Sequence, residues 1–504
     1  MSMKTMNLIA ILLASLVLFS VKTSVAQNTT FILSDYKNPD YFYQTLDFNF
    51  GFNSGLNDYN DSGNENNSYN VFSLNSQAGA LYNRYINSQK AQGDLRISFN
   101  AGIGSGTSNA KYAHNAYDEI KNKSFNHNER LDISGLHRFY NQKNNFIEIN
   151  GGLGVFNRAN SYSDKSYSSG TATISQERKV KDFENSISGA FLIGKGRIEQ
   201  VQDARLALYL LDDLAKLKRE NRPISDEDIT DLAQLITRLK YKRFFDDRLR
   251  KIAEITAIDS LLQQKEIISA ADATYFTSLN DNWEYANNPI RENGYRFYTG
   301  LEAKFGYDYY SEYREHEIPV ELISEIKNKN KLAEYNMVLG YSYEKPTSRR
   351  WQNFANIKGS IGIHQYFKNQ FARNDPDPTT ETNLYSEATP TVNLSGDCGF
   401  GYYPNSRTWL SFRWWLQSSW DKKMEGETKS DKTDLQNNFN INTGPQLYAY
   451  YYLSEKLRLN FSVTGQFNFD NYKYTSDIPE GSVDKETRTI WYQSVSAALA
   501  YSLF

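Results

Sequence analysis

The chain has 504 residues, a formal net charge of −3 and 23% charged residues. A mean hydropathy of −0.65, with no long apolar run after the N-terminal one, excludes a protein that crosses a membrane with several helices. The nearly balanced charge leads us to expect no nucleic-acid partner. The single cysteine, Cys398, excludes a disulfide within the chain.

The N-terminus has the three parts of a secretory signal. Lys4 precedes an apolar run over residues 8–21, and Ser24, Val25 and Ala26 supply the small residues of a cleavage site. A retained membrane helix is the alternative, but the run is short for spanning a bilayer and polar sequence follows at once. We therefore predict that residues 1–26 are a cleaved signal peptide.

Much of the remaining chain alternates between apolar and polar residues. Residues 457–469 carry an apolar residue or glycine at every odd number and a polar residue at every even number. This period predicts a β-strand with one apolar and one polar face, and segments of about ten residues are long enough to cross a bilayer as tilted strands. A secreted β-sandwich also alternates, but 37 Tyr and 29 Phe favour the aromatic girdles of a membrane barrel.

The connections between these segments alternate between short and long. Short turns are predicted near residues 87–90, 141–144, 345–350, 404–407 and 454–455. Long polar loops are predicted near residues 53–68, 104–128, 157–182, 311–331, 368–387, 421–434 and 470–487. This order predicts an up-and-down transmembrane antiparallel β-barrel of about fourteen strands, with one plain rim and one elaborated rim.

One connection is too long for a turn and has a helical period. The apolar residues of its first part lie three or four apart: Val201, Ala204, Leu208, Leu211 and Leu214. Ser225 and Asp228 resemble a capping box. The predicted domains are residues 27–194 with strands one to six, residues 195–290 as an inserted α-helical domain, and residues 291–504 with strands seven to fourteen.

The alternation also predicts which charged residues face the barrel lumen, because a charge against acyl chains costs a few kcal/mol. The lumen-lining candidates are Asp47, Asp94, Arg96, Arg296, Glu302, Lys304, Lys358, Arg413 and Arg458. Both signs are mixed. They fit either a water-filled pore with modest ion preference or an occluded lumen stabilised by ion pairs.

The inserted domain carries one segment dense in charges and aromatic rings. Its candidate partner-docking residues are Arg243, Phe244, Phe245 and Arg248. A solvated helix face explains the same pattern, and a surface for a periplasmic protein or cell-wall polymer is the alternative.

Residues that carry chemistry are sparse. Of five histidines only His364 shares the inward parity of Lys358, and no second catalytic member follows from spacing. No motif indicates a cofactor, a metal site or a catalytic set.

The chain resembles the porin-like outer-membrane β-barrel proteins of Gram-negative bacteria, and the resemblance extends to the aromatic last residue, Phe504. It covers the strand-forming segments and not the helical insert. The resemblance implies an outer-membrane location, with the short turns, both termini and the insert in the periplasm. It also implies contact with outer-membrane lipid and, during assembly, with the barrel-insertion machinery.

Three function classes follow from these features. The first is a pore or export component for a polar solute or polymer, which the helical domain gates or couples. The second is a structural or assembly anchor that presents the helical domain to a periplasmic partner. An outer-membrane hydrolase is the weakest, because only His364 suggests one.

Overall fold

We describe a computed structural model of the chain. It covers residues 31–60, 68–112, 118–168, 171–240, 247–268, 271–285, 291–318, 322–375, 381–422, 433–454, 457–476 and 482–501. The predicted signal peptide (1–26) and Phe504 lie outside these residues.

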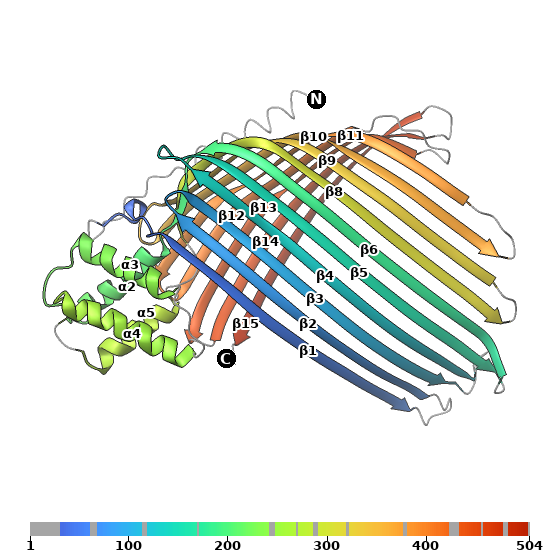
Figure 1. Ribbon diagram of the computed structural model, residues 1–504, viewed down its shortest axis with the longest axis horizontal. Coiled ribbons are helices and arrows are strands. Elements are labelled where there is room, and N and C mark those ends of the chain that lie inside the picture. Colours follow the sequence, from blue (N-terminus) through green and yellow to red (C-terminus); the bar gives the residue numbers. More distant parts are fainter. Residues whose placement is uncertain are drawn as a thin grey trace.

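One antiparallel sheet dominates the molecule (Figure 1). Its strands are β1 (Tyr41–Asn60), β2 (Ser68–Ser88), β3 (Ala91–Lys111), β4 (Glu119–Tyr140), β5 (Asn145–Ser168), β6 (Thr171–Lys195), β8 (Glu292–Ile318), β9 (Leu322–Pro346), β10 (Trp351–Asp375), β11 (Glu381–Asn405), β12 (Thr408–Lys422), β13 (Thr433–Ser454), β14 (Leu457–Ser476) and β15 (Ser482–Tyr501). Each pairs with its neighbour in this order, and the short β7 (Ile198–Gln200) pairs with β8. The fourteen strands on this path in the described residues agree with the predicted number.

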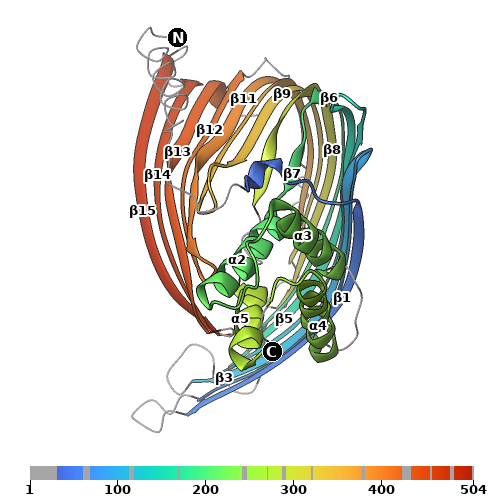
Figure 2. The same ribbon diagram turned by 90° about the vertical axis from the view of Figure 1, so that its left-hand side faces the viewer.

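The sheet curls into an open cylinder. Figure 2 shows the strands curving around a central space, with β1 and β15 at the two edges. Within the described residues β1 pairs only with β2, and β15 only with β14. The antiparallel up-and-down order is therefore as predicted, while closure between the edge strands is not seen.

The strands are longer than the sequence analysis predicts. Apart from the predicted loop at 421–434, most of which lies outside the described residues, the predicted long polar loops continue for most of their length as strand. Asn53–Asn60 of β1, for example, pairs with Asn75–Ser68 of β2. Described strands on the path run from 15 to 27 residues. The prediction of long loops is wrong because it took loss of apolar alternation for loss of strand. A ladder of backbone hydrogen bonds continues through polar residues wherever water covers both faces.

The described residues between β7 and β8 form four helices: α2 (Gln202–Lys216), α3 (Asp226–Lys240), α4 (Asp247–Gln264) and α5 (Ala273–Tyr285). Their apolar stripes meet in one core, in which Leu206, Leu210, Leu214 and Ile236 are almost fully buried. Burying a leucine side chain contributes about 1.5–3 kcal/mol. No described helix combines the length and apolar character that a membrane crossing needs. We call this four-helix unit the helical module.

The predicted capping box begins α3. The backbone N–H of Ser225 donates to Asp228 Oδ2 (3.0 Å), and the N–H of Asp228 donates to Ser225 Oγ (3.2 Å). Arg222 donates to both carboxylate oxygens of Asp228, at 2.7 and 3.0 Å. These bonds hold the pKa of Asp228 well below its ordinary value, and the hydrogen bond from the Arg222 guanidinium has the largest effect.

Two glycines form the root of the helical module. Gly196 has φ +100° and Gly294 has φ +129°, a backbone region that side chains with a Cβ rarely enter. A Cβ at Gly294 would lie 1.9 Å from the carbonyl oxygen of Arg197, and one at Gly196 would lie 2.2 Å from that of Tyr295. The chain leaves β6 and returns to β8 through these two positions.

Candidate functional site: the concave face and its helical cover

The strand register places all nine lumen-lining candidates on one face of the sheet. Residues that pair across two strands lie on the same face of the sheet, and successive residues along a strand alternate between faces. The pairings therefore show which residues of the next strand lie on a given face. Tyr85 on β2, for example, pairs with Asp94 on β3 and with Tyr43 on β1, which has the parity of Asp47. The same steps reach Arg96, Arg296, Glu302, Lys304, Lys358, Arg413 and Arg458.

This face is the concave one. Lys358 on β10 donates to both carboxylate oxygens of Glu302 on β8, at 2.7 and 2.9 Å, across the intervening β9. Curvature brings side chains of alternate strands together on the inner side of a sheet and separates them on the outer side. The opposite face exposes large apolar residues such as Phe48, Phe50 and Leu301, as a lipid-facing surface would.

Further charges on the concave face pair with each other. Arg413 Nε lies 3.3 Å from Asp397 Oδ2. Lys304 and His364 both approach Glu334, at 3.8 and 3.9 Å. The structure thus gives His364 a carboxylate neighbour that spacing did not reveal, because Glu334 comes from the adjacent strand.

Three of these charged residues line a hollow on the concave face. A cavity of about 300 Å³ is lined by Lys358, Arg413 and Asp397 together with the rings of Tyr298 and Trp415. Gly340 on β9 is what lets the Tyr298 ring lie flat, since a Cβ there would meet the ring at 2.2 Å. Cations, acids, amides and an indole line one space, which suits a polar solute better than an apolar one.

The other lumen candidates have different surroundings. The Arg458 guanidinium lies 5.6 Å from the ring centres of both Tyr450 and Tyr452. No ion pair joins Asp47 or Arg96 to a described residue. The concave face is therefore densely paired between β8 and β12 and less so near β1.

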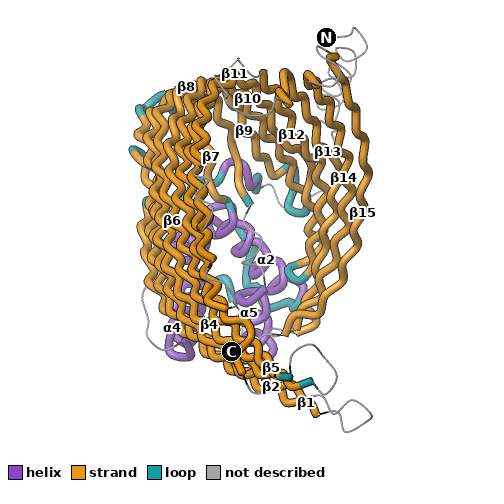
Figure 3. Tube along the Cα trace, turned by 90° about the vertical axis from the view of Figure 1, so that its right-hand side faces the viewer, coloured by secondary structure: helices purple, strands orange, loops and turns teal. Residues whose placement is uncertain are grey.

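The helical module lies across one mouth of the cylinder, at the end with the short turns (Figures 1 and 2). Figure 3 looks in from the opposite end and shows the helices behind the opening. Two turns of this rim bind its helices, and a third binds the connection that leads to it. Arg197 donates to Ser88 O (2.8 Å) and Gln89 O (3.0 Å) in the β2–β3 turn. Asp212 of α2 accepts from Arg349 in the β9–β10 turn, and Asp281 of α5 accepts from Arg407 in the β11–β12 turn.

A buried pair of arginines joins the module to the sheet. The guanidinium groups of Arg205 (α2) and Arg291 lie 5.0 and 4.9 Å from the Tyr403 ring centre. Arg291 is fully buried and donates to the carbonyl oxygens of Ser348 (2.8 Å) and Trp351 (2.7 Å). Burial lowers the pKa of Arg291 to about 10, and it lowers that of Arg205 as well.

The segment before β1 also belongs to the module. Phe31, Leu33 and Tyr36 are buried in the helical core, and Asn293 Nδ2 donates to the carbonyl oxygen of Ser34 at 2.7 Å. Sequence reasoning missed this contact, and it missed the arginine pair. An isolated Arg or a short apolar segment has no period that would mark it.

The partner-docking candidates remain undescribed. Arg243, Phe244 and Phe245 lie outside the described residues, and Arg248 lies in α4 with an undescribed side chain. Within the described part of the chain, no group of three or more His, Cys, Asp and Glu side chains is placed to hold a metal ion.

No family model matches this chain, and no curated protein does. Among solved structures, the transport unit of the autotransporter AIDA-I from Escherichia coli aligns over 82% of this chain and 91% of its own, with 9% identity and a TM-score of 0.23. The siderophore receptor PirA from Acinetobacter baumannii aligns over 93% of this chain and 75% of its own, with 6% identity and a TM-score of 0.16. We draw no functional conclusion from likenesses of this size.

Proposed function

We propose that this protein is an outer-membrane β-barrel that conducts a polar solute or an exported polymer, and that the helical module gates its periplasmic mouth. The observation that carries the proposal is the position of the module. It covers the mouth of a cylinder whose concave face is polar and whose convex face is apolar.

The contacts at the rim favour a gate over a free appendage. Two rim turns bind the module directly, through Arg349 to Asp212 and through Arg407 to Asp281. Arg197, in the connection that leads to the module, binds the β2–β3 turn. Partly exposed ion pairs are modest in energy, about 1 kcal/mol each, so they can open without unfolding either part. A solute passing through the cylinder would have to displace or rearrange this cover.

Planar bilayers test the proposal directly. We would compare the full-length protein with a variant in which an Asn-Gly turn replaces residues 201–291, because β7 and β8 already form the base of a hairpin. The gate predicts low conductance in the full-length protein and steady conductance in the shortened one. Silence in both, with folded sheet shown by circular dichroism, would instead favour the anchor.

A further inference from the structure

The convex face of three neighbouring strands carries a group of lysines. On β9 they are Lys327, Lys329 and Lys331, and on β6 they are Lys179 and Lys181. Pairing through β8 brings the two sets together, since Ser311 of β8 pairs with both Lys181 and Lys327. We call these five residues the lysine patch.

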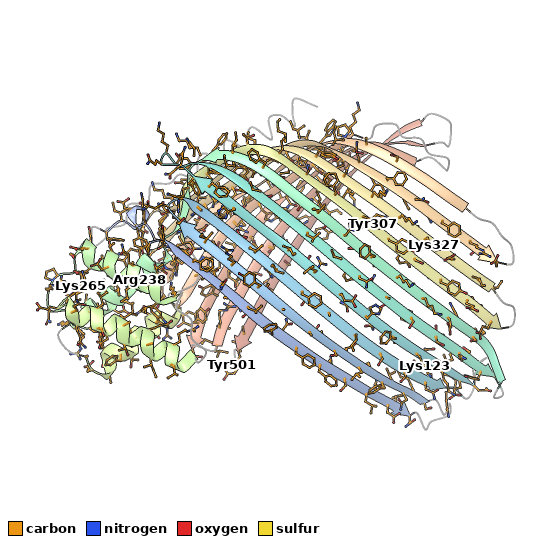
Figure 4. All side chains as sticks on the ribbon, in the orientation of Figure 1. Lys123, Arg238, Lys265, Tyr307, Lys327 and Tyr501 are labelled. Atoms are coloured by element: carbon orange, nitrogen blue, oxygen red, sulfur yellow. The ribbon has the colours of Figure 1, made fainter. Side chains whose placement is uncertain are left out.

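Aromatic rings lie among the lysines of the patch. Lys329 pairs with Tyr309 and Lys331 with Tyr307, both on the convex face. Phe183, Tyr307, Tyr309, Lys327 and Lys329 together line a hollow of about 540 Å³. Figure 4 shows Tyr307 and Lys327 close together on the sheet, well away from the helices.

The patch keeps an excess of positive charge after its internal pairs are counted. Lys327 Nζ lies 2.6 Å from Glu325, and Lys179 Nζ lies 3.1 Å from Glu177. A third acid, Glu315, pairs in register with Glu177 at the far edge. Glu317 of β8, which accepts from Ser175 Oγ on β6, is a fourth acid at this edge. Lys181, Lys329 and Lys331 are exposed and have no ion pair with a described residue, so five lysines face four carboxylates.

The depth of the patch follows from the apolar band beside it. A lysine on a lipid-facing surface costs about 2–4 kcal/mol at the midplane and about 0–1 near the interface. From Phe297 to Tyr307 the convex face of β8 also carries Leu301 and Phe305, which are exposed. Ten residues at about 3.3 Å each, tilted by about 40°, span roughly 25 Å, the height of an apolar band in a barrel. The patch therefore begins where the band ends, on the side opposite the module.

We propose that the lysine patch binds the phosphorylated glycolipid headgroups of the outer leaflet, with phosphates on the lysines and acyl chains against the neighbouring aromatic residues. The proposal rests on the membrane location given above, but not on conduction. Lysines beside a ring of tyrosines combine an anion site with an interfacial anchor. A lipid of two phosphates matches several ammonium groups at neighbouring levels of the sheet.

The test measures lipid binding by the full chain in a neutral detergent. Fluorescent lipid A bearing two phosphates is titrated into wild type, into K327Q/K329Q/K331Q, and into the matched control K304Q/K358Q/K368Q. The control removes the same charge from the concave face of β8 and β10. We expect the first variant to bind more than tenfold more weakly and the control to stay within about twofold of wild type, since each interfacial lysine contributes about 1 kcal/mol.

Competition separates the sources of phosphate. Unlabelled lipid A should displace the probe, and lipid A without phosphates should not. Displacement by millimolar inorganic phosphate alone would show a free-anion site and overturn the proposal, as would equal loss in both variants or no loss in either. A protein that binds lipid A through this patch but never conducts would sink the transport function and leave this inference standing.

Discussion

Arg349, in the turn between β9 and β10, binds the carboxylate of Asp212 on α2, so a rim turn of the sheet is joined to the first helix of the module. The two residues are 137 positions apart in the sequence. Arg407 and Asp281 repeat the arrangement one turn further along the rim. Both pairs lie on the β9–β12 side of the rim, and Arg349 lies in the turn next to the chain connection at Gly196 and Gly294. We call these two ion pairs the latch.

Removing the latch should open the proposed gate. We expect R349A/R407A to raise the open probability in planar bilayers by about tenfold, because two partly exposed ion pairs together contribute roughly 1–2 kcal/mol. Arg350 is the next residue in the same turn and is exposed, so R350A is the matched control. Low conductance in the swapped pair D212R/R349D would assign the effect to the contact itself. Unchanged gating in R349A/R407A would show that other contacts hold the module.

The concave ion pairs should set ion preference if the cylinder conducts. K358Q removes the cation that binds Glu302 and leaves that carboxylate free, so the reversal potential in a KCl gradient should move toward that of K⁺. The shift is expected to be modest, because Lys304, Arg413 and the remaining charges stay in place. K331Q changes the same charge on the convex face and should leave the reversal potential where it was. An equal shift in both variants would mean that Lys358 does not face the conducting path.

The faces of the sheet were predictable from the sequence, and the ends of its strands were not. Alternation at Leu46–Phe52 or at Leu410–Leu416 arises because the two faces differ, with large apolar residues on the convex face and polar residues on the concave face. Beyond the apolar band both faces carry polar residues, so Asn53–Asn60 shows no alternation although its backbone ladder continues. The apolar–polar period of a sequence depends on which residues are buried and not on backbone hydrogen bonding. The sequence alone therefore assigns the polar extensions of the strands to loops.

The site was predictable to the same extent. Parity alone placed Glu302 and Lys358 on one face, but their contact depends on curvature, which no local pattern encodes. The arginine pair around Tyr403 brings together a residue of α2, the residue just before β8 and a residue near the end of β11. Such a contact between distant segments requires the three-dimensional fold, whereas the capping box of Ser225 and Asp228 spans three residues and was visible directly.

Replacing Gly294, one of the two glycines at the root of the helical module, with alanine should loosen the module from the rim of the sheet. G294A forces a Cβ toward the Arg197 carbonyl oxygen in a backbone region that costs about 1–3 kcal/mol for residues other than glycine. We expect faster proteolysis between residues 201 and 291 and conductance resembling that of the latch variant. G189A is the control, since the nearest atom to its Cβ would be 3.8 Å away. Wild-type resistance to protease in G294A would show that the root adapts without glycine.

The capping carboxylate of α3 should make the module sensitive to acid. The folded-state pKa of Asp228 lies below the ordinary value of about 3.9, so its stabilisation is complete above that value and is lost as the pH falls below about 4. D228N should cost about 2 kcal/mol at neutral pH by leaving Arg222 without its charge partner. The difference between wild type and D228N should then shrink as the solution is acidified.

Urea-induced loss of helical ellipticity in the full chain, followed from pH 7 to pH 3, measures both effects. E227Q is the control, because Glu227 is exposed and adjacent in the same helical turn. A wild-type minus D228N difference that stays constant over this range would contradict the assigned role.

If the cylinder closes between β1 and β15, the existing pairings predict the register between these two strands. Followed from strand to strand, the pairings lead from Tyr41 across the sheet to Arg488 of β15. A closed barrel of fourteen strands tilted by about 36° needs an offset of about fourteen residues between Arg488 and the residue that pairs with Tyr41. Because β15 starts at Ser482, shortly before Arg488, only the part of β15 toward the module is long enough for this offset. This offset sets Asp47 opposite Ser496 and uses nearly the whole of both strands.

A disulfide measures that register. In a C398S background, D47C/S496C should form an intramolecular disulfide in the membrane, seen as a mobility change that reductant reverses. D47C/V495C is the control, because Val495 has the opposite parity and its side chain points to the convex face. Unpaired strand edges cannot stay exposed within a bilayer, since each unsatisfied backbone group costs several kcal/mol there. Disulfides between two chains would therefore mean that the edges pair with a second copy, and that the conduit, where there is one, is built from more than one chain.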